Sequence, residues 1–128
     1  MIKILVVDDV EGWRNHHSAI LKSMFPECVI HTAESAREGY EKVFENNLQP
    51  YNIILTDLQM ESDFEPMYAG EWLVERIKEM RNYYRTQIVI ISATYNIRLV
   101  AERLGVDFIP KATARNSSDA YEFLKLNL

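Results

Sequence analysis

The sequence predicts an α/β fold in which helices cover both faces of a single doubly wound, five-stranded parallel sheet. Short apolar runs alternate along the whole chain with amphipathic segments of helical period. The run at residues 53–55 is apolar without interruption, which is typical of a strand buried on both faces of a parallel sheet. With 128 residues and 48% hydrophobic content, the chain can build one sizeable core, so we expect residues 1–128 to form one domain.

The elements are expected to follow one another in strict alternation. The expected strands are residues 2–7, 28–32, 52–57, 87–91 and 107–110. The expected helices run from about residue 13 to residue 25, from 35 to 46, through 72–80, from 96 to 104, and from 117 or 118 through 124. The connection at residues 59–69 is longer than the usual length of about two to six residues between a strand and a helix.

Local signals set several of the expected helix ends. The first helix should end before Pro26, because the residue before a proline disfavours helical geometry. Ser35 is expected to be the N-cap of the second helix, and Glu38 completes a capping box. Gly105 is expected to terminate the fourth helix. The second helix should present one apolar face made of Ala36, Tyr40, Val43 and Phe44.

The composition excludes several classes of protein. A formal net charge of -5 and a pI near 5.2 argue against general nucleic-acid binding, which normally requires a basic patch. No stretch approaches the roughly 18 apolar residues of a membrane span, and the amino terminus lacks a signal-peptide layout. We therefore expect a cytoplasmic protein that binds neither nucleic acid nor membrane. Cys28 is expected to be a small buried hydrophobe. The histidines at 16, 17 and 31 lack metal-ligand spacing and are expected on the surface or on helix faces.

Polar residues follow the apolar runs where each predicted strand ends. Asp8 and Asp9 follow the first run, Asp57 ends the third, Ser92 follows the fourth, and Lys111 follows the last. In open parallel sheets, ligands bind just beyond the carboxyl ends of the strands. We therefore expect these side chains to converge on one small acidic pocket, in which Asp57 is the reacting group.

This grouping favours phosphoryl transfer assisted by a divalent cation. Three crowded carboxylates repel one another, and a hard cation such as Mg²⁺ removes that conflict. A metal offsets the charge on a moving phosphoryl group, and a carboxylate such as Asp57 accepts that group as an acyl phosphate. Lys111 would supply positive charge to the phosphoryl oxygens, and Ser92 a hydroxyl hydrogen bond. Each residue alone has an ordinary explanation as a cap, a turn residue or a solvated charge, so their joint placement favours the functional interpretation.

Taken together, these residues resemble the receiver domain of two-component response regulators. The matching segments are Val6-Val7-Asp8-Asp9, Leu55-Thr56-Asp57-Leu58-Gln59-Met60, Ile91-Ser92-Ala93 and Phe108-Ile109-Pro110-Lys111. The resemblance covers essentially the whole chain, and the segments occur in the family's order. It implies a flavodoxin-like fold with strand order 2-1-3-4-5.

The resemblance also implies a role for each matching residue. Asp57 corresponds to the aspartate that a partner histidine kinase phosphorylates. The implied Mg²⁺ ligands are Asp9, Asp57 and the backbone carbonyl of Gln59, with Asp8 as the second acid of the pair. The implied switch and phosphate-contacting residues are Ser92, Phe108 and Lys111.

The sequence departs from the family pattern near the predicted site. About five extra residues, Glu61–Glu65, extend the connection at residues 59–69. They form either an acidic flap that alters kinase access and phosphate lifetime or a tolerated surface loop, and the sequence favours neither. Ala112 follows Lys111 where the family commonly has proline. We expect the Lys111–Ala112 bond to be trans, because a cis non-proline bond costs about 3 kcal/mol.

We predict that the chain is a phosphoacceptor receiver domain that modifies only itself and turns over no metabolite. Its upstream partner would be a sensor histidine kinase or a histidine phosphotransfer protein. Its downstream partner would be an unknown protein target or an output domain, because the chain is either a stand-alone receiver or a fragment of a longer regulator. The sequence leaves open whether a homodimer forms.

Two alternative functions stay open at this stage. The first is a pseudo-receiver that binds proteins without being phosphorylated, and the intact set of five site residues argues against it. The second is a small hydrolase that uses Asp57 as a transient nucleophile. It would need a second acid that activates water on the acyl phosphate, and the sequence assigns none.

Overall fold

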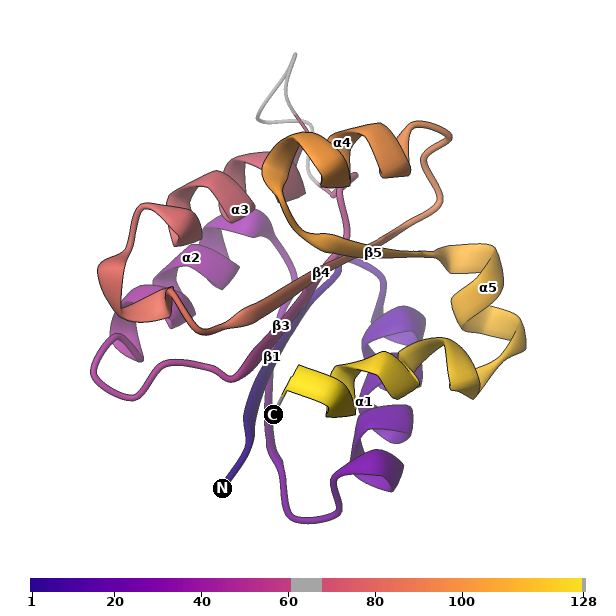
Figure 1. Cartoon of the computed structure of the whole chain (residues 1–128), viewed down its shortest axis with the longest axis horizontal. Coiled ribbons are helices and arrows are strands. Elements are labelled where there is room, and N and C mark those ends of the chain that lie inside the picture. The colour runs from indigo at the N-terminus through magenta and orange to yellow at the C-terminus, as the bar shows by residue number, and fades with distance from the viewer. Residues whose placement is uncertain (61–67, 128) are drawn as a thin grey trace.

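All five predicted strands occur in the computed structural model of the chain, which describes residues 1–60 and 68–127 (Figure 1). The strands are β1 (Lys3–Val7), β2 (Val29–Ala33), β3 (Ile53–Thr56), β4 (Gln87–Ser92) and β5 (Asp107–Pro110). They pair in parallel in the order β2-β1-β3-β4-β5. This topology confirms the predicted fold class and the strand order 2-1-3-4-5.

Helices cover both faces of the sheet. The α-helices are α1 (Glu11–Met24), α2 (Ala36–Glu45), α3 (Ala69–Lys78), α4 (Ile97–Leu104) and α5 (Lys111–Asn116), and two 3₁₀ helices are η2 (Arg81–Tyr83) and η3 (Ser118–Asn127). Helices α2, α3 and α4 pack on one face, and α1, α5 and η3 pack on the other (Figure 1). The sheet is therefore the central layer of three, as expected for a doubly wound fold.

Residues of β1 alternate between the two cores that flank the sheet. Leu5 and Val7 belong to the core beneath α2, α3 and α4, whereas Ile4 and Val6 belong to the core beneath α1, α5 and η3. All four side chains are almost completely buried. Burial of one such side chain contributes about 1.5–3 kcal/mol, so β1 is firmly held between the two cores.

The predicted capping signals act at α2 and α4. The backbone N–H of Glu38 donates to the Ser35 hydroxyl at 3.1 Å, and the Glu38 carboxylate accepts from the N–H of Glu34 at 3.1 Å. Gly105 ends α4 in the left-handed region with φ of 72°, a conformation that is costly for residues with a Cβ. Both signals were local, which explains why they could be predicted from the sequence.

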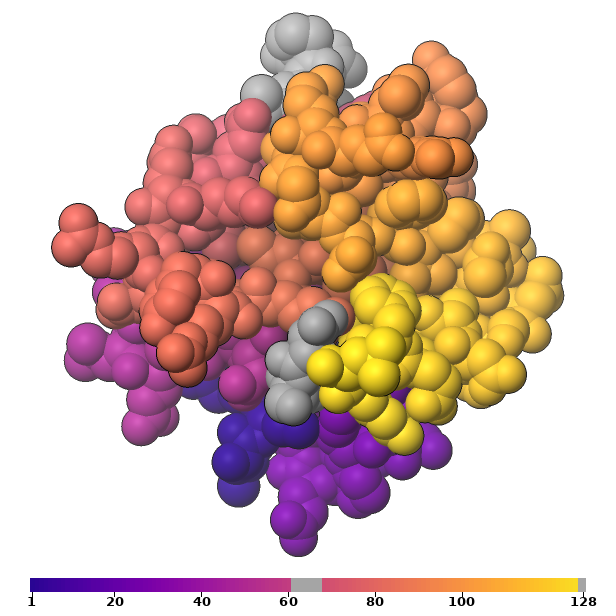
Figure 2. All heavy atoms as spheres, viewed as in Figure 1, coloured from indigo at the N-terminus to yellow at the C-terminus, as the bar shows by residue number. Residues whose placement is uncertain are grey.

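The end of the chain differs from the prediction of one helix starting at Ser117 or Ser118. An α-helix, α5, begins at Lys111 directly after Pro110, and the 3₁₀ helix η3 follows it. The Ser117 hydroxyl does cap η3, since it accepts from the N–H of Asp119 at 3.2 Å. Tyr121 and Leu124 are both fully buried, and a spacing of three residues aligns side chains in a 3₁₀ helix. Helix η3 thereby contacts α1, as the neighbouring yellow and violet surfaces in Figure 2 show.

Side-chain burial confirms the expectation for Cys28 and corrects the expectation for Phe44. Cys28 is buried, as expected. Phe44 is 65% exposed, although it was expected on the apolar face of α2, because its neighbour Val43 takes the core position and successive helical residues diverge by about 100°. His17 lies on α1, in line with the expected helix-face position, but it is buried, and its Nδ1 lies 2.7 Å from the hydroxyl of Tyr121.

Two further expectations concern the surface of the chain. The inserted residues Glu61–Glu65 lie outside the described residues, so their role stays a prediction. Among the helices of residues 1–60 and 68–127, none combines the length and the apolar content needed to cross a bilayer.

Candidate functional site

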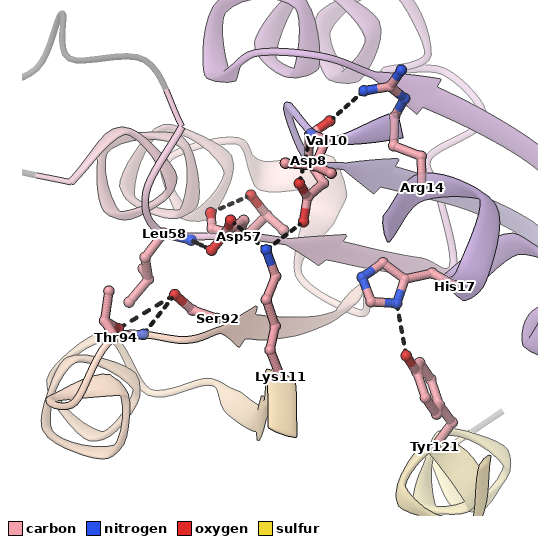
Figure 3. A network of polar contacts seen from close by, with 11 residues as sticks. Asp8, Val10, Arg14, His17, Asp57, Leu58, Ser92, Thr94, Lys111 and Tyr121 are labelled. Carbon is pink, nitrogen blue, oxygen red and sulfur yellow. Dashed lines mark hydrogen bonds and ion pairs between the residues drawn. The ribbon is translucent and has the colours of Figure 1, made fainter. Parts of the chain in front are cut away.

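The predicted polar residues meet at one edge of the sheet, where four strands end (Figure 3). Asp8 directly follows β1, Asp57 directly follows β3, Ser92 is the last residue of β4, and Lys111 directly follows β5. Because β1 and β3 pair in parallel up to their last residues, Asp8 and Asp57 leave the sheet side by side. The structure thus brings Asp8, Asp57 and Lys111 into contact at the carboxyl edge, as expected, whereas the hydrogen bonds of Ser92 are made with Thr94.

Lys111 bridges two buried carboxylates. Its Nζ lies 2.9 Å from Oδ2 of Asp57 and 3.0 Å from Oδ2 of Asp8. All three residues are at most 9% exposed, so water screens these charges only weakly. The contact with Asp57 is a hydrogen bond as well as an ion pair. The contact with Asp8 lacks that alignment, so within the described part of the chain Oδ2 of Asp8 has no hydrogen-bond donor.

Backbone N–H groups hold the other oxygen of each carboxylate. The N–H of Leu58 donates to Oδ1 of Asp57 at 2.7 Å, and the N–H of Val10 donates to Oδ1 of Asp8 at 2.9 Å. A hydrogen bond to a charged group contributes about 1.5–3 kcal/mol. These bonds therefore fix the orientation of both carboxylates, and in each case Oδ2 faces Lys111.

Burial and the neighbouring charges shift the pKa values of Asp8 and Lys111. Burial raises the pKa of Asp8 above its ordinary value and the charge of Asp57 raises it further, against the hydrogen bond from Val10 and the charge of Lys111. Burial alone would lower the pKa of Lys111, but its hydrogen bond with Asp57 and its interactions with the charges of Asp57 and Asp8 outweigh burial and raise it. Lys111 therefore stays cationic at neutral pH and offsets part of the negative charge.

Three carboxylates in the site fit a hard divalent cation. Asp8, Asp9 and Asp57 each offer one oxygen, and these oxygens lie within 4.8 Å of one another. Mg²⁺ prefers a few carboxylate ligands together with waters, and the exposure of Asp9 leaves room for water. Gln59, the further ligand implied by the resemblance, is an exposed residue two positions after Asp57, and its role as a ligand stays a prediction.

Gly70 permits α3 to start directly against the site. Its N–H donates to the carbonyl of Leu58 at 3.0 Å. A Cβ at this position would overlap the carbonyl oxygen of Asp57 and would lie 2.8 Å from Cα of Leu58. Only glycine allows so close an approach of two backbone segments. The first turn of α3 thus packs directly against the segment that carries Asp57.

The two predicted switch residues make their contacts outside the carboxylate cluster. Ser92 is buried, its hydroxyl accepts from the N–H of Thr94 at 3.3 Å, and it also pairs with the Thr94 hydroxyl at 3.3 Å (Figure 3). Phe108 is half-buried and packs against the core beneath α2, α3 and α4. The structure therefore holds the Ser92 hydroxyl on Thr94, and the switch roles of both residues stay predictions.

Two residues of α1 contact the site without having been predicted. Arg14 donates from Nη1 to the carbonyl of Asp8 at 2.8 Å and forms an ion pair with Glu34 at 3.2 Å. The ring of Trp13 lies 5.0 Å from Nζ of Lys111. Both residues belong to the first predicted helix, but the contact of Trp13 with Lys111 depends on how α1 packs against a residue far away in the chain.

The sequence matches the family described as "Response regulator receiver domain" over residues 4–120. The chain belongs to this family. It is also 32% identical to the protein-glutamate methylesterase/protein-glutamine glutaminase 4 of Hahella chejuensis (strain KCTC 2396), over 98% of this chain. The receiver spans 31% of the length of that relative.

Solved structures support the same fold. The chemotaxis response regulator CheY4 of Vibrio cholerae is 20% identical, with a TM-score of 0.78 over 100% of this chain and 99% of that chain. TrrA of Thermotoga maritima, solved in complex with Mg(2+)-BeF, is 23% identical, with a TM-score of 0.78 over 100% of both chains. The response regulator domain of Thermotoga maritima CheB is 25% identical, with a TM-score of 0.67 over 98% of this chain and 90% of that chain.

Membership in the family identifies the general character of the site. Receiver domains are signalling modules of two-component systems that bind Mg²⁺ at an acidic pocket, and the aspartate cluster of this receiver fits such a pocket. They interact with histidine kinases or phosphotransfer proteins and with downstream targets.

Proposed function

We propose that residues 1–128 form one receiver domain in which Asp57 accepts a phosphoryl group from a histidine kinase or a histidine phosphotransfer protein. The observation that carries the proposal is the bridging of two buried carboxylates by the Lys111 ammonium beside a third, exposed carboxylate. A structural ion pair does not need a third acid, whereas a phosphoryl site needs both a metal position and a cation for the phosphoryl oxygens.

In the proposed reaction, one carboxylate oxygen of Asp57 attacks the phosphorus of the donor. The phosphorus–nitrogen bond of the donor phosphohistidine breaks, its electron pair stays with the imidazole nitrogen, and an acyl phosphate forms on Asp57. Nζ of Lys111 already contacts Oδ2 of Asp57. Its ammonium is therefore close enough to pair with the oxygens of a phosphoryl group that forms on Asp57.

Asp8, Asp9 and Asp57 would hold Mg²⁺, with the backbone carbonyl of Gln59 as a further ligand. The bound ion would neutralise charge on the transferred group. The raised pKa of Asp8 comes mainly from its burial, and a cation next to its carboxylate removes the cost of keeping it ionised. The metal would thus neutralise the part of the carboxylate charge that Lys111 alone does not offset.

The output of the site is proposed to be a shift between two conformations. Ser92 would leave Thr94 and pair with the phosphoryl group, and Phe108 at the adjacent strand would follow. A modification that favours one of two states by a few kcal/mol is sufficient for such a population shift. The domain would then present an altered face to a cytoplasmic protein target or output domain, and its chemistry would be limited to its own phosphorylation and dephosphorylation.

Intact-mass spectrometry after incubation with phosphoramidate and Mg²⁺ tests the proposal. We expect the wild type to gain about one phosphoryl group, and only when Mg²⁺ is present. Asp57→Asn should gain none. The matched control is Asp107→Asn, because Asp107 is an exposed aspartate at the opposite end of β5, and it should be phosphorylated like the wild type.

A negative result would also be decisive. If the folded wild type gains no phosphoryl group and does not bind beryllofluoride in the presence of Mg²⁺, the phosphoacceptor function is wrong. A protein-binding pseudo-receiver would then be the better interpretation, and the insertion at Glu61–Glu65 would be the first segment to delete.

A further inference from the structure

The indole ring of Trp13 lies against two cations of α5. The ring centre is 5.0 Å from Nζ of Lys111 and 5.3 Å from the guanidinium carbon of Arg115. Lys111 and Arg115 are four positions apart, so they occupy the same face of α5, and this face is turned toward α1. A cation within about 6 Å of an indole centre is attracted by the negative face of the ring.

A second contact joins α1 and α5 close to Trp13. Nε2 of His16 lies 2.9 Å from the carbonyl oxygen of Ala114, within hydrogen-bond distance. Trp13 is half-buried, so its contact with a cation is only partly screened by water. The Trp13 ring also lies 5.3 Å from the ring of His16 and 5.3 Å from the ring of His17, both on α1, so it has contacts outside the acidic cluster.

Lys111 has to satisfy conflicting demands. Its ammonium is surrounded by the carboxylates of Asp8 and Asp57, and its four-carbon stem has considerable rotational freedom. In the proposed phosphoryl transfer, the same ammonium has to stay within the site while its partner changes from a carboxylate to a phosphoryl group. A neutral aromatic face attracts the ammonium without competing for the phosphoryl oxygens or the metal.

We propose that Trp13 is a positioning residue that keeps the Lys111 ammonium in place beside Asp8 and Asp57 by a cation–π contact. The inference rests on the proposed phosphoacceptor function, because the benefit of a positioned Lys111 is the contact with the incoming phosphoryl group. Trp13 touches neither Asp8 nor Asp57 in the contacts described, so it acts through Lys111 and is not itself a catalytic residue.

The first test compares wild type, Trp13→Phe and Trp13→Leu in the free protein, without Mg²⁺ or phosphodonor. The readout is the ¹³C relaxation order of the Lys111 ε-methylene group. We expect high order in the wild type, intermediate order in Trp13→Phe and low order in Trp13→Leu, because phenyl has the weaker cation attraction and leucine has none. Trp72→Leu is the matched control, since Trp72 is the other half-buried tryptophan, lies on α3 and stacks on Arg76 instead.

The second test separates metal binding from anion binding. Beryllofluoride affinity should fall about three- to tenfold in Trp13→Leu, which is the range expected for loss of one partly buried cation–π contact. Mg²⁺ affinity should not weaken, because Trp13 contacts the lysine and not the carboxylates. Equal weakening of both affinities would indicate general damage to the pocket and would overturn the inference.

The two tests distinguish failure of the inference from failure of the proposed function. Unchanged order of Lys111 in Trp13→Leu overturns the positioning role, whether or not the protein is phosphorylated. A wild type that takes up neither phosphoryl group nor beryllofluoride overturns the function, and the relaxation comparison then still decides the contact. If Trp13→Leu does not fold, Trp13→Phe decides alone, and wild-type order of Lys111 in that variant contradicts the inference.

Discussion

Nζ of Lys111 and Oδ2 of Asp57 lie 2.9 Å apart, although the two residues are separated by 54 positions in the chain. The contact joins the end of β5 to the end of β3, with β4 between them in the sheet. Asp8, at the end of β1, shares the same ammonium. The charge balance of the site therefore depends on one side chain that no local sequence signal ties to its partners.

Removing Lys111 should destabilise the protein in a way that Mg²⁺ repairs. In Lys111→Ala, Asp8 and Asp57 lose their shared cation, and breaking a buried pair costs about 3 kcal/mol. We expect the loss in urea unfolding without Mg²⁺ and a clear recovery when Mg²⁺ is added. Lys125→Ala is the control, because Lys125 is exposed and its pair with Glu122 contributes less than about 0.5 kcal/mol. Equal losses in both variants would contradict the prediction.

Gly70→Ala should displace the backbone that carries Asp57. The added methyl group would overlap the carbonyl of Asp57, and neither backbone segment can move without shifting the other. Overpacking of this kind costs about 1–3 kcal/mol, and we expect weaker Mg²⁺ binding as well. The control is Gly12→Ala, because Gly12 lies on α1 with no atom within 4 Å of an added Cβ. That variant should be as stable as the wild type or slightly more stable in chemical unfolding.

His17 should make the protein acid-sensitive. Burial is the main reason that the pKa of His17 is lowered from 6.5 to about 3, with further contributions from the charges of His16 and Lys111. Between these values the unfolded state binds more protons than the folded state, so stability falls as the pH drops below 6.5. The expected loss at pH 5 is about 2 kcal/mol relative to neutral pH.

The variant His17→Gln isolates this contribution. Glutamine retains a hydrogen-bonding group for the Tyr121 hydroxyl but does not titrate between pH 4 and pH 7. We expect the pH dependence of urea unfolding over this interval to flatten by the amount assigned to His17. The same slope in wild type and variant would show that another group accounts for the acid sensitivity.

Two arginines of α4 should differ in their contribution to stability. Arg103 forms an ion pair with Glu71 of α3, which is 7% exposed, whereas Arg98 pairs with Glu102, whose side chain is 59% exposed. Arg103→Ala leaves a buried carboxylate without its cation, which we expect to cost about 1–2 kcal/mol because the arginine itself is exposed. Arg98→Ala should cost less than about 0.5 kcal/mol. Thermal unfolding of the two variants at neutral pH measures the difference, and a larger loss in Arg98→Ala would contradict this explanation.

Local patterns account for the expectations that proved correct. The cap at Ser35 and the stop at Gly105 depend on residues within one helical turn, so they were predictable without knowledge of packing. Phe44 and the helix type of residues 118–127 were predicted wrongly because they depend on packing. The side of α2 that meets the sheet selects Val43 over Phe44, and the burial of Tyr121 and Leu124 against α1 accompanies a 3₁₀ helix rather than an α-helix.

The sequence by itself determined the parallel sheet, its helices and the set of polar residues at the strand ends. These follow from periodicity and from residues that stand next to one another in the chain. The tertiary structure decided which of those residues share a charge: it placed Lys111 between Asp8 and Asp57 and brought Trp13 against Lys111. These contacts join residues that are distant in sequence, and only the packing of α1 and α5 on the sheet brings them within a few ångströms of one another. At such distances in a buried site, the electrostatic interaction between charges is strong.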